Sequence, residues 1–210
     1  MGIIRRGILG GFSNKVGNIV GSTWKGIAVI KSLPLSVANP RTAGQVKQRQ
    51  RFSKLTVVAS LLLSSIIKPL WDRFATGMSG YNAFISANRD AFQNNNWIDD
   101  QKIVMSRGRI LAPVITLAQV TGSNLVVTIA NPTFDRFGLP TDRIYVVGCD
   151  SQLTAFPAAQ ISNTSRGANP TVQVTVPITS AGSAGNIEVV YAGYLRADGS
   201  EVSTSTVYTM

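Results

Sequence analysis

The chain has 210 residues and a net charge of +10, with 20 Lys and Arg against 10 Asp and Glu, and it contains one cysteine and no histidine. The lack of histidine excludes Ser-His-Asp and Cys-His catalysis and histidine metal sites, and a single cysteine excludes an intrachain disulfide. With 44% hydrophobic residues the chain can bury a core. We therefore predict a folded protein that is not an enzyme, needs no cofactor and has no small-molecule substrate.

Charged residues make up only 14% of the chain, which is a low share for a monomer that must solvate its whole surface. Two interpretations remain open at this point. The chain makes extensive contacts between subunits, or it is a compact β protein whose surface is rich in Ser, Thr and Asn.

The positive charge is concentrated in the N-terminal half. Residues 1–109 hold 16 Lys and Arg against 4 Asp and Glu, whereas residues 110–210 hold 4 against 6. The first acidic residue is Asp72, and 11 cations precede it. Such a segment repels itself unless a polyanion or an acidic partner compensates. We predict that DNA, RNA or an acidic protein surface is bound by Arg5, Arg6, Lys15, Lys25, Lys31, Arg41, Lys47, Arg49, Arg51 and Lys54.

Residues 1–38 have the composition of a basic, glycine-rich β-hairpin arm. Residues 24–31 are typical of one strand, and residues 14–17 of a turn. A segment of this length is too short to close a sheet of its own, so we expect it to dock on a neighbouring subunit with Trp24 at the centre of the contact. The alternative is that the hairpin folds back on its own helix, with Trp24 in the core.

Residues 39–109 form a predicted helical region. Thr42 followed by Gln45 has the pattern of a capping box, and the helix is expected to run from residue 43 to a stop at Pro69. Lys47, Arg51 and Lys54 share one face of that helix, which is either a solvated basic face or a ligand-binding one. A second helical segment is expected over residues 71–93, with an interruption at residues 77–80.

No membrane partner is expected. The most apolar run, residues 55–67, contains 13 residues, which is too few to span a bilayer. The first residues lack the apolar stretch of a signal peptide, so none is expected.

From residue 110 onward the pattern changes to short strands separated by turn residues. The predicted strands are residues 114–120, 124–130, 144–149, 171–176, 187–195 and 201–208, and the last two are expected to form a hairpin. Cys149 lies in an apolar run and is expected to be a buried residue rather than a reactive thiol. Six or seven strands in about 100 residues favour an immunoglobulin or fibronectin-like antiparallel β-sandwich. The predicted fold class is thus α+β, with domains at 1–38, 39–109 and 110–210.

Several N-terminal motifs are similar to those of a known family. They are Gly7-Ile8-Leu9-Gly10-Gly11-Phe12-Ser13-Asn14-Lys15-Val16-Gly17, Val20-Gly21-Ser22-Thr23-Trp24-Lys25-Gly26, Lys31-Ser32-Leu33-Pro34, and Asn39-Pro40-Arg41-Thr42 with Gln45, Gln48, Arg49 and Phe52. Over residues 2–54 the chain resembles the domain of unknown function 6266, found in Bacteroidetes and their phages. The family has no assigned activity, so the resemblance implies only a phage or prophage setting.

Charge, composition and resemblance together favour a structural virion protein, either a capsid, neck or tail-associated subunit. Its expected partners are further copies of itself, other virion proteins, and DNA or RNA, and its expected place is the virion, assembled in the bacterial host cytoplasm. The alternative is a nucleic-acid-binding module that acts outside a virion.

Overall fold

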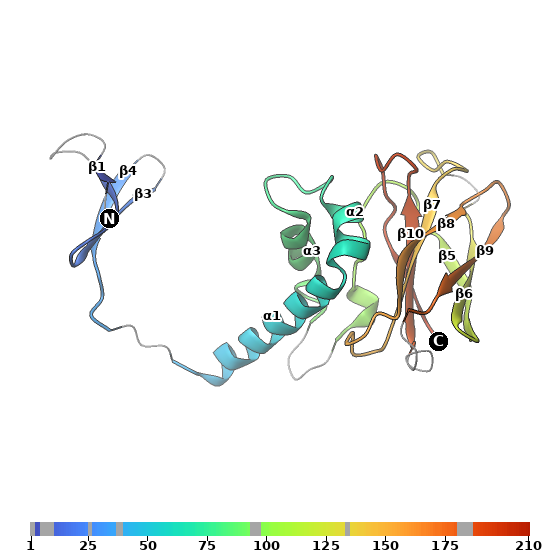
Figure 1. Cartoon of the computed structure of the whole chain (residues 1–210), viewed down its shortest axis with the longest axis horizontal. Helices are drawn as coiled ribbons and strands as arrows, with labels where there is room; N and C mark the ends of the chain where they lie inside the picture. The colour runs from blue at the N-terminus through green and yellow to red at the C-terminus, as the bar shows by residue number, and fades with distance from the viewer. Residues whose placement is uncertain are drawn as a thin grey trace. The chain divides into compact units, whose positions relative to one another are not determined.

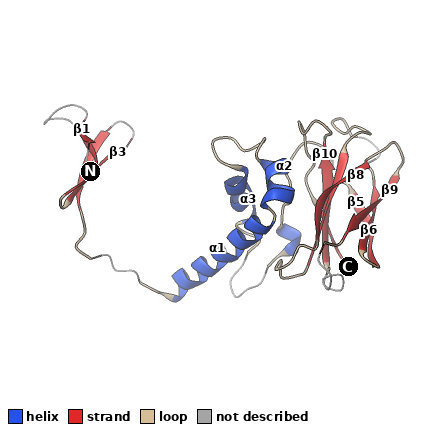
Figure 2. Cartoon of the chain, in the orientation of Figure 1, coloured by secondary structure: helices blue, strands red, loops and turns tan. Residues whose placement is uncertain are grey.

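The computed structural model describes residues 3–4, 11–24, 27–36, 40–92, 98–132, 135–179 and 187–210. These residues divide into two compact units, Met1–Thr42 and Ala43–Met210. Figure 1 shows the elements of both along the chain, and Figure 2 separates helices from strands. We refer to them below as the N-terminal unit and the C-terminal unit.

The N-terminal unit is an antiparallel sheet with the order β1-β2-β3-β4. Its strands are β1 (Ile3–Ile4), β2 (Phe12–Val16), β3 (Ile19–Trp24) and β4 (Ile27–Ser32). The turn after β2 contains Gly17 at φ 57°, a left-handed conformation that glycine adopts without a steric penalty. Trp24 pairs with Ile27 in antiparallel register, so the single strand predicted over residues 24–31 is instead the meeting point of two strands.

The helical region consists of α1 (Ala43–Leu61), a π-helix (Leu63–Ile67), α2 (Lys68–Trp71), α3 (Gly80–Asn88) and a 3-10 turn (Asp100–Lys102). The prediction that Pro69 ends the helix is wrong, since the chain stays helical to Trp71. Pro69 falls in the first turn of α2, where its missing N–H removes no bond that the helix needs. α1 and the helical segment Leu63–Trp71, which begins with the π-helix, meet at a bend of 65°. α3 begins after Ser79, whose side chain accepts a hydrogen bond from the Asn82 N–H.

Seven strands follow in two antiparallel sheets, β11-β10-β7-β8 and β5-β6-β9. They are β5 (Val114–Thr121), β6 (Asn124–Ala130), β7 (Arg143–Cys149), β8 (Ala158–Ser165), β9 (Thr171–Pro177), β10 (Val189–Leu195) and β11 (Thr206–Thr209). In chain order β5, β6 and β9 take the places of immunoglobulin strands A, B and E, and β7, β10 and β11 those of C, F and G. The α+β class with a C-terminal antiparallel sandwich is therefore confirmed, and β8 is the strand that the sequence pattern missed.

Two apolar cores lie on opposite faces of the four-stranded sheet. Side chains such as Val146 and Tyr194 face the three-stranded sheet and pack on residues that include Leu125 of β6. Tyr145 and Tyr191, from the same two central strands, face the other way and pack against the helices. The C-terminal unit thus has three layers, with the helices on one side of the four-stranded sheet and the second sheet on the other (Figure 1).

This layering explains how the chain divides. The sequence predicts separate domains at 39–109 and 110–210, whereas the observed division is at Thr42, and residues 43–210 form a single unit. The apolar stripe of the helical region packs on β7 and β10, so helices and sandwich share one core. The predicted end of the N-terminal arm, residue 38, lies among the residues outside the described ranges.

Candidate binding surfaces and a buried polar network

The two faces of the N-terminal sheet differ in charge. Lys15 pairs with Val20, and Val20 with Lys31, so both ammonium groups lie on the same face of the sheet. The opposite face carries Asn14, Gly21 and Ile30 in one cross-strand row and Val16, Ile19 and Ser32 in the next. Phe12 lies on that second face, because a Cβ added at Gly21 would meet the Phe12 ring at 2.6 Å. The sheet therefore has one basic face and one uncharged, largely apolar face.

The N-terminal sheet has almost no interior. Among the residues of this unit whose side chains the structure describes, Gly21 is the only buried one. The exposed fractions are 46% for Val16, 42% for Ile19 and 59% for Ile30. The unit therefore presents apolar side chains to water that a stable domain would ordinarily cover.

The predicted cations of residues 41–54 lie in α1, except Arg41, which precedes it. Arg41, Lys47 and Arg49 are exposed, and every residue from 43 to 50 is exposed as well. The first buried residue of α1 is Leu55. This part of the helix is thus a basic surface that stands out from the core.

The predicted face of Lys47, Arg51 and Lys54 is partly occupied by contacts within the chain. Arg51 donates from Nη2 to the backbone carbonyl of Arg89 at 2.8 Å and lies 3.9 Å from the Asp90 carboxylate. Lys54 Nζ donates to Gln152 Oε1 at 3.5 Å. The acid-free stretch of sequence thus receives an acidic neighbour, Asp90, from the turn that follows α3. The sequence alone could not reveal this contact.

Some predicted residues cannot be placed. Arg5, Arg6 and Lys25 lie outside the described residues. Trp24 ends β3 and its backbone pairs with Ile27, but its side chain is not among those described. Its proposed role at an interface stays a prediction.

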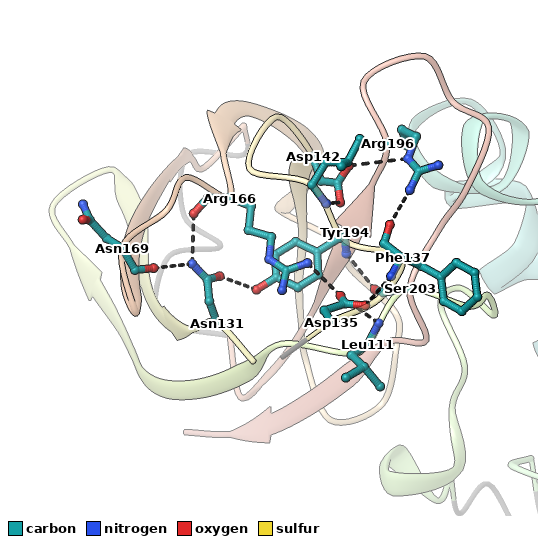
Figure 3. A network of polar contacts seen from close by, with 11 residues as sticks. Leu111, Asn131, Asp135, Phe137, Asp142, Arg166, Asn169, Tyr194, Arg196 and Ser203 are labelled. Atoms are coloured by element: carbon teal, nitrogen blue, oxygen red, sulfur yellow. Dashed lines mark hydrogen bonds and ion pairs between the residues drawn. The ribbon is translucent and has the colours of Figure 1, made fainter. Parts of the chain in front are cut away.

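A buried polar network, shown in Figure 3, joins loops at one end of the sandwich. Arg166 Nη1 lies 2.8 Å from Asp135 Oδ2, with the two side chains 8% and 2% exposed. The Arg166 guanidinium also stacks on the Tyr194 ring, 4.7 Å from its centroid, and the Tyr194 hydroxyl bonds to Asn131 Oδ1 at 2.5 Å. Burial by itself would raise the pKa of Asp135, but the hydrogen bonds from Arg166 and the Phe137 N–H outweigh it and hold that pKa below its usual value.

A second buried carboxylate lies beside this network. Asp142 is fully buried; its Oδ2 accepts the Leu139 N–H at 2.7 Å, and its Oδ1 lies 3.9 Å from Arg196 Nε without a hydrogen bond. Burial raises the pKa of Asp142, and the Leu139 N–H and the Arg196 charge offset only part of that effect.

The arrangement suits a structural clamp better than a reaction site. Each carboxylate faces a guanidinium and accepts hydrogen bonds from backbone N–H groups. Cys149 is buried, as predicted, and burial raises the pKa of its thiol. No sequence pattern indicated the network, because its bonded partners are separated by up to 63 residues, as Asn131 and Tyr194 are.

The raised pKa of Asp142 has a consequence that can be measured. Its folded-state pKa lies above 3.8, the value for an unperturbed side chain, so the wild type loses stability as the pH rises through the window between those two values. Asn does not titrate. We therefore expect a pH-dependent difference in the free energy of unfolding between the two proteins. The value for Asp142→Asn minus the value for the wild type should increase from about pH 4 upward and then level off.

Urea denaturation at a series of pH values measures this difference. Asp198→Asn is the control with the opposite sign, because hydrogen bonds from Ser200 lower the pKa of the exposed Asp198. Through Asp198, the wild type gains stability as the pH rises from the lowered pKa of this carboxyl group to 3.8. A pH-independent difference for Asp142→Asn would contradict the prediction.

Two further findings concern membranes and metals. Among the described helices, no single one is long and apolar enough to cross a membrane, although α1 and the bent segment Leu63–Trp71 together reach that length and composition. Within the described ranges, no three His, Cys, Asp or Glu side chains gather where they could hold a metal ion.

Comparison with known proteins gives one match. No curated protein and no solved structure matches the chain significantly. The model of a family of unknown function, DUF6266, matches residues 11–209, which extends the N-terminal resemblance through the helices and both sheets of the sandwich. The chain therefore belongs to the family of unknown function DUF6266.

Proposed function

We propose that the chain is a non-catalytic structural subunit of a multi-copy assembly whose N-terminal sheet joins one subunit to the next. The phage setting implied by the sequence resemblance makes a bacteriophage particle, assembled in the host cytoplasm, the assembly that we propose. We propose that the subunit belongs to the capsid, the neck or the tail of that particle.

The observation that carries this proposal is the N-terminal sheet without a core. A sheet of a few short strands is marginally stable in water unless one of its faces is covered. Val16, Ile19 and Ile30 are each more than 40% exposed. Covering such side chains contributes about 25 cal/mol for each Å² of apolar surface removed from water. Docking on a neighbouring subunit provides that cover.

The uncharged face is the one that we assign to the contact. Burying the face of Lys15 and Lys31 would require two ammonium groups to lose water, which costs more than it gains unless each finds a partner. The face of Val16, Ile19 and Ile30 carries no charge among its described residues. Contact through this face leaves both lysines available to an acidic surface or a nucleic acid.

Deleting residues 1–42 should convert the assembled protein to monomers, since the C-terminal unit keeps its own cores. Within the full chain, Ile30→Ser should weaken self-association by roughly tenfold or more. Ile27→Ser is the matched control, because Ile27 lies on the same strand and the opposite face and is 61% exposed against 59% for Ile30.

Size-exclusion chromatography with light scattering measures both effects over a range of concentrations. Assembly that survives the deletion would overturn the proposal. A larger effect of Ile27→Ser than of Ile30→Ser would show that the basic face makes the contact instead.

The second candidate is a nucleic-acid-binding module that acts outside a particle. The observation in its favour is the pair of exposed lysines, Lys15 and Lys31, on one face of a small sheet. Such a module would be monomeric and would lose affinity for duplex DNA steeply with salt, with a slope of about 0.9 for each phosphate contacted. Light scattering and a salt titration distinguish it from a structural subunit.

A further inference from the structure

Helix α1 presents an uncharged stripe on the side opposite its buried residues. At about 100° per residue, Leu55, Val58 and Leu62 point into the core, and the positions half a turn away form the opposite side. That side includes Val46, Val57 and Leu61, which are 36%, 54% and 51% exposed. Its remaining positions are polar, uncharged and exposed: Gln50, Ser53 and Ser60. We call these six residues the α1 stripe.

The α1 stripe has the spacing of a helix-packing seam. Its positions 46, 50, 53, 57 and 60 recur at alternating intervals of four and three, which is the period of a coiled coil. Ser60 donates its hydroxyl proton to the Thr56 carbonyl of its own helix at 2.8 Å, so burying Ser60 leaves no donor without a partner. Small serines also allow close approach of a second helix.

Cations lie on both sides of the α1 stripe. Lys47 and Lys54 follow one edge and Arg49 the other, as their positions around the helix dictate. Residues 43–71 contain no Asp or Glu. The cations also lie towards the N-terminal end of α1. The helix dipole is positive there and adds to the electrostatic repulsion among them. An uncharged seam between rows of cations matches a helix with acidic flanking positions.

We propose that the α1 stripe binds an acidic amphipathic helix of another protein, a proposal that rests on the structural-subunit function and names a partner class for it. The charges around the α1 stripe determine which partner can bind to it. A second copy of α1 carries the same cations, and residues 1–42 hold six Lys and Arg and no acid, so neither complements the stripe. A phosphate backbone would be attracted by the cations but would make no favourable apolar contact with Val46, Val57 and Leu61. An acidic amphipathic helix would interact favourably with both.

A synthetic peptide of about three heptads, with Leu at a and d and Glu at e and g, is the probe. The full-length chain should bind this peptide and should not bind the same peptide with Lys at e and g. The double substitution Val57→Gln and Leu61→Gln should weaken binding by about tenfold or more, and Lys47→Glu should weaken it as well. Leu117→Gln on β5 is the matched control, since Leu117 is 46% exposed on a different surface, and it should bind as the wild type does.

Fluorescence anisotropy with a labelled peptide gives these affinities. Unchanged binding by the Val57 and Leu61 double variant would overturn the proposal. The proposal would also be overturned if the acidic peptide did not bind while duplex DNA, or vesicles with anionic lipids, bound the full chain and lost affinity on substitution of Val57 and Leu61. The double variant should assemble like the wild type in light scattering, because the N-terminal sheet is unchanged. Failure of the α1 proposal can therefore be told apart from failure of the proposed function.

Discussion

Replacing Asp135 by Ala should lower the free energy of unfolding by about 3–5 kcal/mol, because the Arg166 guanidinium would be left buried without its counter-charge. The two side chains are 2% and 8% exposed and lie 2.8 Å apart. Asp135 also accepts the backbone N–H groups of Leu111 at 3.2 Å and Phe137 at 3.0 Å, and truncation would remove both acceptors. Urea denaturation followed by circular dichroism measures the loss.

An exposed ion pair provides the control for that experiment. Asp90 pairs with Arg89 at 3.2 Å, and the two side chains are 78% and 70% exposed. Pairs of this kind contribute little to stability, because water and salt screen their charges. Asp90→Ala should therefore change stability far less than Asp135→Ala does. Adding Arg166→Met to Asp135→Ala should recover part of the loss, since the buried charge is then gone. Equal effects of the two aspartate substitutions would contradict the structural role of the network.

Gly193→Ala should destabilise the C-terminal unit by about 1–3 kcal/mol through overpacking. Gly193 in β10 lies opposite Tyr145 in β7, and a Cβ at that position would come within 2.6 Å of the Tyr145 ring. Tyr145 is fully buried, and its hydroxyl bonds to that of Ser106, so the ring has no open space to move into. Thermal and urea unfolding should both report the loss.

The same substitution at Gly44 is the matched control. Gly44 lies in α1, and a Cβ there would have nothing within 4 Å. Because alanine has a higher helix propensity than glycine, Gly44→Ala should stabilise the chain by up to about 1 kcal/mol. Two substitutions of identical chemistry should thus have opposite signs. A stabilising effect at Gly193 would mean that β7 and β10 can separate without cost.

Local patterns predicted the strands that are rich in β-forming residues, including the fully buried β10. Residues 124–130 were predicted as a strand and form β6 with the same bounds, and its alternate side chains Leu125, Val127 and Ile129 are buried. β8 escaped prediction because the sequence Ala-Ala-Gln-Ile-Ser-Asn-Thr-Ser has few β-formers, and its pairing with β7 decides its conformation.

Long-range pairs were beyond the reach of the sequence. The uneven charge distribution identified Lys15, Lys31, Arg41, Lys47 and Arg49, which are exposed as a binding surface requires. It could not show that Arg51 meets Asp90, or that Arg166 meets Asp135, because each pair comes together only when separate elements pack. The two faces of the N-terminal sheet likewise depend on strand register, which a one-residue shift would reverse.

The four-stranded sheet has no face turned towards water along β10, where all seven residues are buried. In an ordinary sandwich, every second residue of a strand is free to become polar during evolution, because it faces solvent. That freedom is absent from β10. β9 on the other sheet keeps it, since Gln173 and Thr175 are exposed on either side of the buried Val174. Sequence divergence within the family should therefore concentrate in the outer sheet and the loops, and the central strands should change only between apolar residues of similar volume.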